Sequence, residues 1–250
     1  MNRAAALKRT TETYVLLAVV LAVVLYPIWL LVIGPLWAIP AALVVAGAAV
    51  GLLYLRSDAL TLRALGARPL GDDEAPRLFN LVEGLTVAHG FRFPDLYIVD
   101  DGAPNAGVGG RAPKHGTLIV TSGLLDRLDR IQLEAVLTHE LMRIRRGDGA
   151  VNVTVATVVA PIARVSPSLG AKLAARLVDP DRAVAADLAA TNITRYPPAL
   201  AAALESVRAD GRVVVANRRA YRHLWLVTPP EPLVESAFSV DERIAVLYEL

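Results

Sequence analysis

The most apolar part of the chain lies near its N-terminus, where residues 14–55 form a run of 42 positions without a charged side chain. One membrane-spanning helix needs roughly 20 apolar residues, so this run predicts two spans. Gly34-Pro35 is the natural break between them, because proline removes a helical hydrogen-bond donor and glycine loosens the backbone. Pro27 falls inside the first span, where it is expected to kink the helix. A cleaved signal peptide fits less well, because the apolar run is too long and continues into a second span.

Beyond this run, the pattern of hydrophobic and polar positions predicts a mostly helical domain with a small β-sheet. Leu78, Leu81 and Leu85 recur at helical spacing, whereas two short β-rich runs bounded by polar residues are typical of strands. The predicted helices cover residues 72–90, 124–148 (one helix or two in succession), 179–194, 198–210 and 241–250, and the predicted strands cover 95–100 and 116–123. The Gly- and Pro-rich residues 101–116 are predicted to form a loop or an irregular hairpin.

A second apolar segment, residues 149–163, is uncharged but only 15 positions long. It is short for a full span, so a buried helix, a re-entrant segment or a helix that dips into the membrane fits better. We therefore divide the chain into an N-terminal tail with two transmembrane helices, residues 1–56, and a second domain, residues 57–250, which contains this candidate membrane-associated segment.

Composition and charge place the chain in the membrane and exclude several functions. Hydrophobic residues make up 54% of the chain, and mean hydropathy is +0.45, which is too apolar for an ordinary soluble domain. The net charge is only +2, and the absence of a basic stripe with interleaved aromatic residues argues against a nucleic-acid partner. The chain has no cysteine, which excludes disulfides and thiolate chemistry. Basic residues flank both ends of the apolar run, so the positive-inside rule predicts a multi-pass protein of the cell membrane whose second domain faces the cytoplasm.

One stretch, "LTHELMRIRRGD" at residues 137–148, approaches a metal-binding pattern. In H-E-x-x-H on a helix, two histidines on one face bind zinc while the glutamate acts as general base. Here His139 and Glu140 are followed by Arg143 where the second histidine would stand. Alone, the His-Glu pair is weak evidence for a metal site, and an ordinary helix whose glutamate pairs with an arginine and whose histidine packs on the core explains it better.

The flanking sequence strengthens the case that the His-Glu pair comes from a metallopeptidase motif. The loop "PNAGVGGR" (104–111), the run "LIVTSGLLDRLDRIQLEAVLTHEL" (118–141), the following "RIRRGD" and the tail "VDERIAVLYEL" resemble the HtpX-like membrane zinc metallopeptidases, relatives of the CAAX prenyl protease. The resemblance covers essentially the whole chain. It implies an α+β, mostly helical zincin-like metallopeptidase domain with a small β-sheet, joined to the N-terminal transmembrane hairpin.

The same resemblance implies a zinc site that this chain has lost. The family's ligands are the two histidines of the motif and a glutamate on a later helix, and these positions hold His139, Arg143 and Ala183 here. Arginine stays protonated and alanine has no donor atom, so His139 is the only retained ligand. Zinc is the family's cofactor, but none is expected here. Glu140 is then a vestigial general base, since a water molecule that zinc does not activate is no nucleophile. By the same analogy, Asp187 would orient a ligating histidine.

Without zinc, the retained carboxylates need another counter-charge, because an unpaired buried carboxylate is costly. Our hypothesis is that Arg143 takes over the electrostatic role of zinc by pairing with Glu140, Asp187 or both. The alternative is that Arg143 points to solvent with Arg145 and Arg146. Three further histidines are possible substitute ligands but have no motif spacing with His139, and surface or packing roles fit them better: His89, His115 and His223.

The function expected from these features is that of a membrane-anchored pseudopeptidase that binds a peptide or a partner membrane protein as a scaffold or regulator. In the family, the strand after the Asn-Ala loop can accept a peptide as an added strand, and such pairing needs no metal. The expected peptide-binding residues are Asn105, Ala106, Thr117, Leu118, Ile119 and Val120. An active zinc metalloendopeptidase with a rearranged site, and a structural subunit of a larger membrane complex, are the alternatives. The sequence leaves the oligomeric state open.

Overall fold

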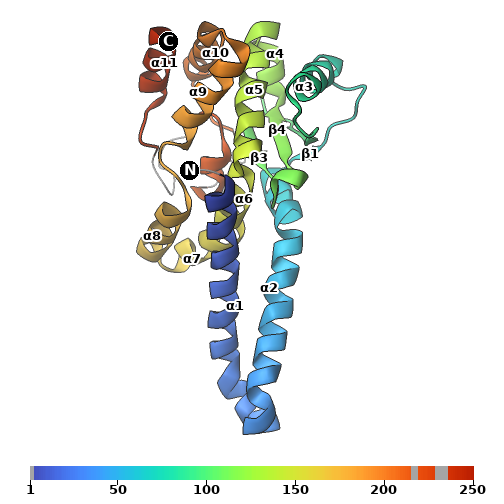
Figure 1. The fold of residues 1–250 in the computed structure, drawn as a ribbon, viewed down its shortest axis with the longest axis vertical. Helices are drawn as coiled ribbons and strands as arrows, with labels where there is room; N and C mark the ends of the chain where they lie inside the picture. Colours follow the sequence, from blue (N-terminus) through green and yellow to red (C-terminus); the bar gives the residue numbers. More distant parts are fainter. Residues whose placement is uncertain (1–2, 215–218, 229–235) are drawn as a thin grey trace.

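The N-terminal part of the protein is a long helical hairpin in the computed structural model, which describes residues 3–214, 219–228 and 236–250 (Figure 1). Helix α1 (Arg3–Ile33) and helix α2 (Pro35–Leu65) meet at Gly34, whose φ of 79° is readily adopted only by glycine. Ala22, Ala42 and Ala46 pack where the helices face each other, and such small residues allow a close approach. Both helices are long and apolar enough to cross a membrane, so the predicted break at Gly34-Pro35 is confirmed.

A four-stranded mixed sheet lies at the base of the hairpin, in the strand order β1-β2-β4-β3. Strand β4 (Thr117–Thr121) is parallel to β2 (Asp95–Val99) on one side and antiparallel to β3 (Ala106–Gly109) on the other. The two-residue strand β1 (Arg68–Pro69) pairs with the outer edge of β2. Strand β4 is therefore an interior strand, and β3 forms one edge of the sheet.

Helices cover the sheet and enclose the main core. Helix α5 (Arg130–Arg146) contacts both β3 and β4, and the later helices α9 (Arg182–Thr194), α10 (Pro197–Asp210) and α11 (Val240–Glu249) pack around it. Helix α3 (Pro76–His89) also contacts α5, and α4 (Ser122–Arg127) follows β4 directly. Short 3₁₀ helices, η1 (Pro113–His115) and η3 (Arg219–Leu224), complete this part. The core of leucines and valines between α5, the sheet and α10 holds α5 in place.

A second helical unit runs from the end of α5 back along the hairpin. It consists of α6 (Asp148–Thr154), the π-helical turn η2 (Val155–Val159), α7 (Ala160–Val165) and α8 (Pro167–Leu177). Figure 1 shows α7 and α8 beside the upper part of α1. Residues Asp148–Val165 are apolar and long enough to be a third candidate span, yet 67% of their most apolar window is buried inside the protein.

The predicted fold class, a mostly helical α+β protein with a small sheet and two apolar N-terminal helices, is confirmed. Three local predictions differ from the structure. Strand β3 lies inside the predicted loop 101–116. Its sequence "AGVG" has little β-propensity of its own, so the strand depends on its pairing with β4. Helix α3 begins at Pro76 rather than residue 72, since proline favours the first turn. Helix α8 was not predicted.

Candidate active site

Helix α5 carries the motif residues into the centre of the protein. Its start is fixed by a capping box between Asp129 and Gln132, which satisfies backbone donors that a helix otherwise leaves free. The apolar neighbours of the motif anchor the same helix face in the main core. His139, Glu140 and Arg143 are consequently buried, with 1%, 0% and 2% of their surface exposed.

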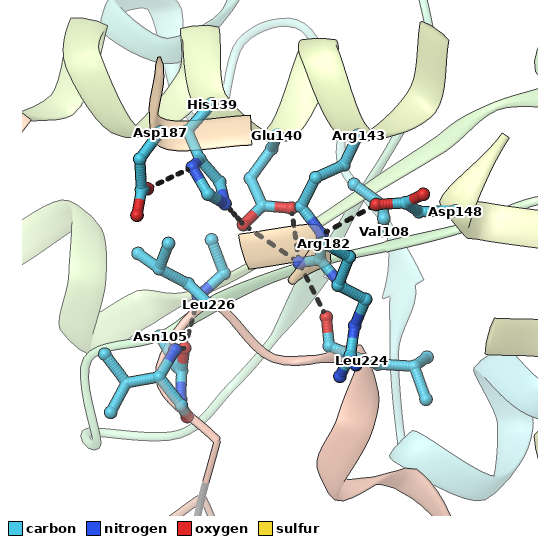
Figure 2. A network of polar contacts seen from close by, with 12 residues as sticks. Asn105, Val108, His139, Glu140, Arg143, Asp148, Arg182, Asp187, Leu224 and Leu226 are labelled. Carbon is cyan, nitrogen blue, oxygen red and sulfur yellow. Dashed lines mark hydrogen bonds and ion pairs between the residues drawn. The ribbon is translucent and has the colours of Figure 1, made fainter. Parts of the chain in front are cut away.

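Arg143 pairs with Glu140, as Figure 2 shows. The Nη1 atom of Arg143 donates to Oε2 of Glu140 at 2.9 Å and to Oε1 at 3.2 Å. The spacing of three residues places both side chains on the same helix face. Arg143 therefore does not point to solvent, and the alternative that grouped it with Arg145 and Arg146 is wrong.

Asp187 takes a different partner, which the sequence did not indicate. Arg243 of α11 donates to both carboxylate oxygens of Asp187, from Nε at 2.7 Å and from Nη2 at 2.9 Å. The Nδ1 atom of His139 lies 2.8 Å from Oδ1 of Asp187. Burial alone would raise the pKa of Asp187, but Arg243 and His139 outweigh it and hold that pKa below its usual range.

Arg182 and Asp148 complete a buried charge cluster. Among the described residues, Arg182 donates to the backbone carbonyls of Asp179 and His223. Burial, reinforced by the charge of Arg143, lowers the pKa of Arg182 to about 10. Asp148 lies 3.9 Å from Nε of Arg143. Three guanidinium groups (Arg143, Arg182, Arg243) thus stand against three carboxylates (Glu140, Asp148, Asp187), all buried. The cluster therefore holds as many guanidinium groups as carboxylates.

The same three arginines hold a segment of the chain itself. Residues 223–227 run along the outer edge of β3, with Trp225 opposite Gly107 in an antiparallel bridge. Arg182 binds the carbonyl of His223 at 3.2 Å, Arg143 binds that of Leu224 at 3.0 Å, and Arg243 binds that of Leu226 at 2.8 Å. The buried arginines therefore act as carbonyl clamps on this segment, which we call the edge segment.

The loop residues predicted to bind a peptide also contact the edge segment. The side-chain amide of Asn105 donates to the carbonyl of Val227 at 2.9 Å and accepts from its N–H at 3.2 Å, and the carbonyl of Ala106 accepts from Leu226 at 2.7 Å. The edge of β3 is thus filled by the protein's own chain.

The prediction that Thr117, Leu118, Ile119 and Val120 offer a free edge to a peptide is wrong. These residues belong to β4, whose backbone pairs with β2 on one side and β3 on the other. All four are also buried. An added strand requires unpaired backbone groups, and β4 has none to offer.

Gly107 makes the close approach of the edge segment possible. A Cβ atom at this position would lie 2.8 Å from the carbonyl oxygen of Leu224. We expect Gly107→Ala to lower stability by roughly 1–3 kcal/mol, because the edge segment must shift. Gly84→Ala is the matched control, since a Cβ there meets nothing within 4 Å and alanine stabilises a helix interior by roughly 0.5–1 kcal/mol. Thermal unfolding of the full chain in detergent would show opposite shifts, and equal shifts would contradict this account.

The residues at the site do not fit a zinc ion. Within the described ranges, no three His, Cys, Asp or Glu side chains are grouped so as to hold a metal. Ala183 lines a pocket of about 390 Å³ together with His139, Arg143 and Arg182 and contributes no donor. A divalent cation would add two positive charges to a buried cluster in which the guanidinium groups already equal the carboxylates in number.

The remaining histidines lie in other settings. His223 is fully buried and its Nε2 lies 3.0 Å from the carbonyl oxygen of Asn152. Burial, together with Arg182, lowers its pKa to about 3, so its imidazole is neutral. His115 is exposed in η1, and His89 ends α3 beside Phe91.

A membrane hairpin, a small mixed sheet and a buried His-Glu pair on the helix that supports it define a membrane-anchored protein of the metallopeptidase-like class. Residues 72–196 match the model for peptidase family M48. The chain belongs to this family, among its HtpX-like members.

Two relatives are similar in sequence to this chain over most of its length. The Protease HtpX homolog of Tropheryma whipplei (strain Twist) is 34% identical over 233 residues, covering 79% of this chain and 80% of that protein. The Protease HtpX homolog of Dictyoglomus thermophilum is 31% identical over 226 residues, covering 76% and 75%. No solved structure matches the chain.

Proposed function

We propose that the protein is a pseudopeptidase of the cell membrane: an HtpX-like M48 member without zinc or catalysis, which acts as a scaffold or regulator for a partner membrane protein. The observation that carries the proposal is the Arg143 guanidinium on the Glu140 carboxylate. A general base needs a water molecule to activate. In this site the Glu140 carboxylate is paired with the Arg143 guanidinium group. Among the described residues, no set of ligands is present that could hold an activating metal.

The filled edge of β3 favours a protein partner over an extended peptide. Leu224, Trp225 and Leu226 are each at most 2% exposed, and removing such side chains from water stabilises a fold by about 1.5–3 kcal/mol each. A peptide that added to β3 would have to displace all three. The apolar hairpin, by contrast, exposes many large hydrophobic side chains to its surroundings, and in a bilayer these faces contact lipid or another membrane protein.

The proposed topology follows from the hairpin. The uncharged part of α1, residues 14–33, and that of α2, residues 35–55, are each about 30 Å long at 1.5 Å per residue, which matches the hydrocarbon thickness of a bilayer. Both charged flanks lie at the same end of the hairpin as the folded domain. We therefore place that domain in the cytoplasm.

Metal analysis of the purified full-length protein tests the proposal. We expect far less than one zinc per chain, and no chelator-sensitive cleavage of an unfolded protein substrate such as casein. One zinc per chain together with chelator-sensitive cleavage would overturn the proposal in favour of an active peptidase with a rearranged site.

A double variant sharpens this test. Arg143→His with Ala183→Glu removes one positive charge and adds one negative charge, a change of −2 that the charge of one Zn²⁺ offsets. We expect this variant to bind zinc at about one ion per chain, since three protein ligands are then present. The matched control combines Arg143→His with Leu188→Glu, because Leu188 is exposed on the same helix. The control carries the same charge but should remain without zinc.

A further inference from the structure

The corner between α7 and α8 reaches the depth of the membrane-spanning part of the hairpin. Ile162 of α7 packs against a cluster formed by Tyr14, Val50 and Val158. Thr157 of η2 lies 3.3 Å from the hydroxyl of Tyr14, the first residue of the uncharged run. A helix rises 1.5 Å per residue, so Val50 lies roughly 8 Å along α2 from Leu55, the last residue of the uncharged run. The corner therefore lies at a depth where the hairpin is surrounded by lipid.

The side chains at this corner are apolar and uncovered. Val165 ends α7 with 89% of its surface exposed, and Leu169 in the first turn of α8 is 48% exposed. The opposite face of α8 is occupied, because Ala174 and Leu177 pack with Ala6 of α1. The exposed apolar side chains thus lie on the outer side of the corner, beside a helix that crosses the bilayer.

Basic side chains lie above the apolar tip. Leu169, Lys172 and Arg176 are spaced three and four residues apart, so they share one exposed face of α8. Arg164 is exposed just before the corner. None of the three basic residues has an ion pair with a carboxylate in the part of the chain that the structure describes. Long basic side chains of this kind extend to the headgroup level while their stems stay in an apolar layer.

We propose that the α7–α8 corner is embedded in one leaflet, on the side of the folded domain, and that Arg164, Lys172 and Arg176 bind the headgroups of anionic phospholipids. The corner does not cross the bilayer, because the chain turns back at Ser166 and most of the apolar segment before it is buried in the protein. Helices that lie in the membrane interface are buried by about 5–10 Å, which agrees with the depth of Ile162. Each basic side chain near an anionic surface strengthens association about fivefold. The inference does not depend on whether the site binds zinc.

The depth of the α7–α8 corner in the bilayer can be measured with a single fluorophore. The chain has no cysteine, so Val165→Cys in the full-length protein gives one labelling site for an environment-sensitive dye. Val87→Cys is the matched control, because Val87 is also apolar and 78% exposed but lies on α3, which contacts α5 and lies above the uncharged part of the hairpin in Figure 1. In nanodiscs that contain brominated phosphatidylcholine, we expect quenching of the dye at position 165 and not at 87. Equal quenching at both positions overturns the membrane insertion.

Lipid selectivity is measured with the same label. At equal mole fraction, brominated phosphatidylglycerol should quench the dye at position 165 at least twofold more strongly than brominated phosphatidylcholine. Lys172→Glu with Arg176→Glu should abolish this difference while quenching by phosphatidylcholine persists. Arg130→Glu with Arg195→Glu makes the same charge change at exposed positions elsewhere and should leave the selectivity intact. Equal quenching by both lipids in the otherwise unchanged protein, or equal effects of the two charge variants, overturns the headgroup site.

Discussion

Replacing Arg143 with methionine is expected to destabilise the protein by about 3–5 kcal/mol. The change keeps most of the side-chain volume but leaves the Glu140 carboxylate buried without its counter-charge, and it also frees the carbonyl of Leu224. Denaturant or thermal unfolding of the full chain in detergent measures the loss. Arg145→Met is the matched control on the same helix. Arg145 is exposed and stacks over Phe91, so its removal should cost no more than about 1 kcal/mol.

A double-mutant cycle separates the charge effect from packing. Glu140→Gln in the Arg143→Met background removes the uncompensated charge, so it should recover a large part of the lost stability. Alone, Glu140→Gln should destabilise, because it leaves Arg143 with only a carbonyl and the more distant Asp148. If Arg143→Met costs no more than Arg145→Met, Arg143 is not the charge that stabilises the site.

Arg243→Met is expected to lower the stability of the fold by a similar amount, about 3–5 kcal/mol. It removes both hydrogen bonds to Asp187 and the bond to the carbonyl of Leu226. These bonds are the ones that Arg243 makes from α11 to α9 and to the edge segment. Arg208, an exposed arginine paired with Asp241 near the start of α11, provides the control, and Arg208→Met should cost at most about 1 kcal/mol.

The lowered pKa of Asp187 leads to a prediction for how the stability of the fold depends on pH. Burial opposes the charged form, but Arg243 and His139 outweigh it, so the folded-state pKa lies below the unfolded value of about 3.9. The stabilisation is therefore present above that value and is lost as the pH falls toward the folded-state pKa. Unfolding measured from pH 6 down to pH 3 should show a steeper loss in the unaltered protein than in Asp187→Asn. Parallel curves would contradict the contribution of Asp187.

The parts of the structure that sequence predicts well are those set by local pattern. The uncharged run and its Gly34-Pro35 break predict the hairpin, and the three-residue spacing on one helix predicts the pairing of Arg143 with Glu140. Arg243 could not be paired with Asp187 in the same way, because 56 positions separate them. One signal was available: Arg243 lies on the same helix face as Leu247, so a charge stands on the apolar side of α11.

Strand order was the other non-local feature. Strands β2 and β4 are neighbours although β3 lies between them in the chain, and β3 itself is too glycine-rich to be read as a strand. The sequence therefore suggests β4 as the strand with a free edge, whereas β1 and β3 are the edge strands of the sheet. Nothing in the periodicity of residues 223–227 indicated that they would cover it.

The equal number of buried guanidinium and carboxylate groups bears on how the site could change by mutation. Arg143→His alone, or Ala183→Glu alone, would leave one uncompensated negative charge in the protein interior, before a complete ligand set exists to attract a cation. Either first step toward a metal site is thus selected against for stability, and only the pair together with the ion restores balance. The proposed loss of the metal site would then be hard to reverse, because a return to histidine and glutamate would have to pass through a poorly folding intermediate.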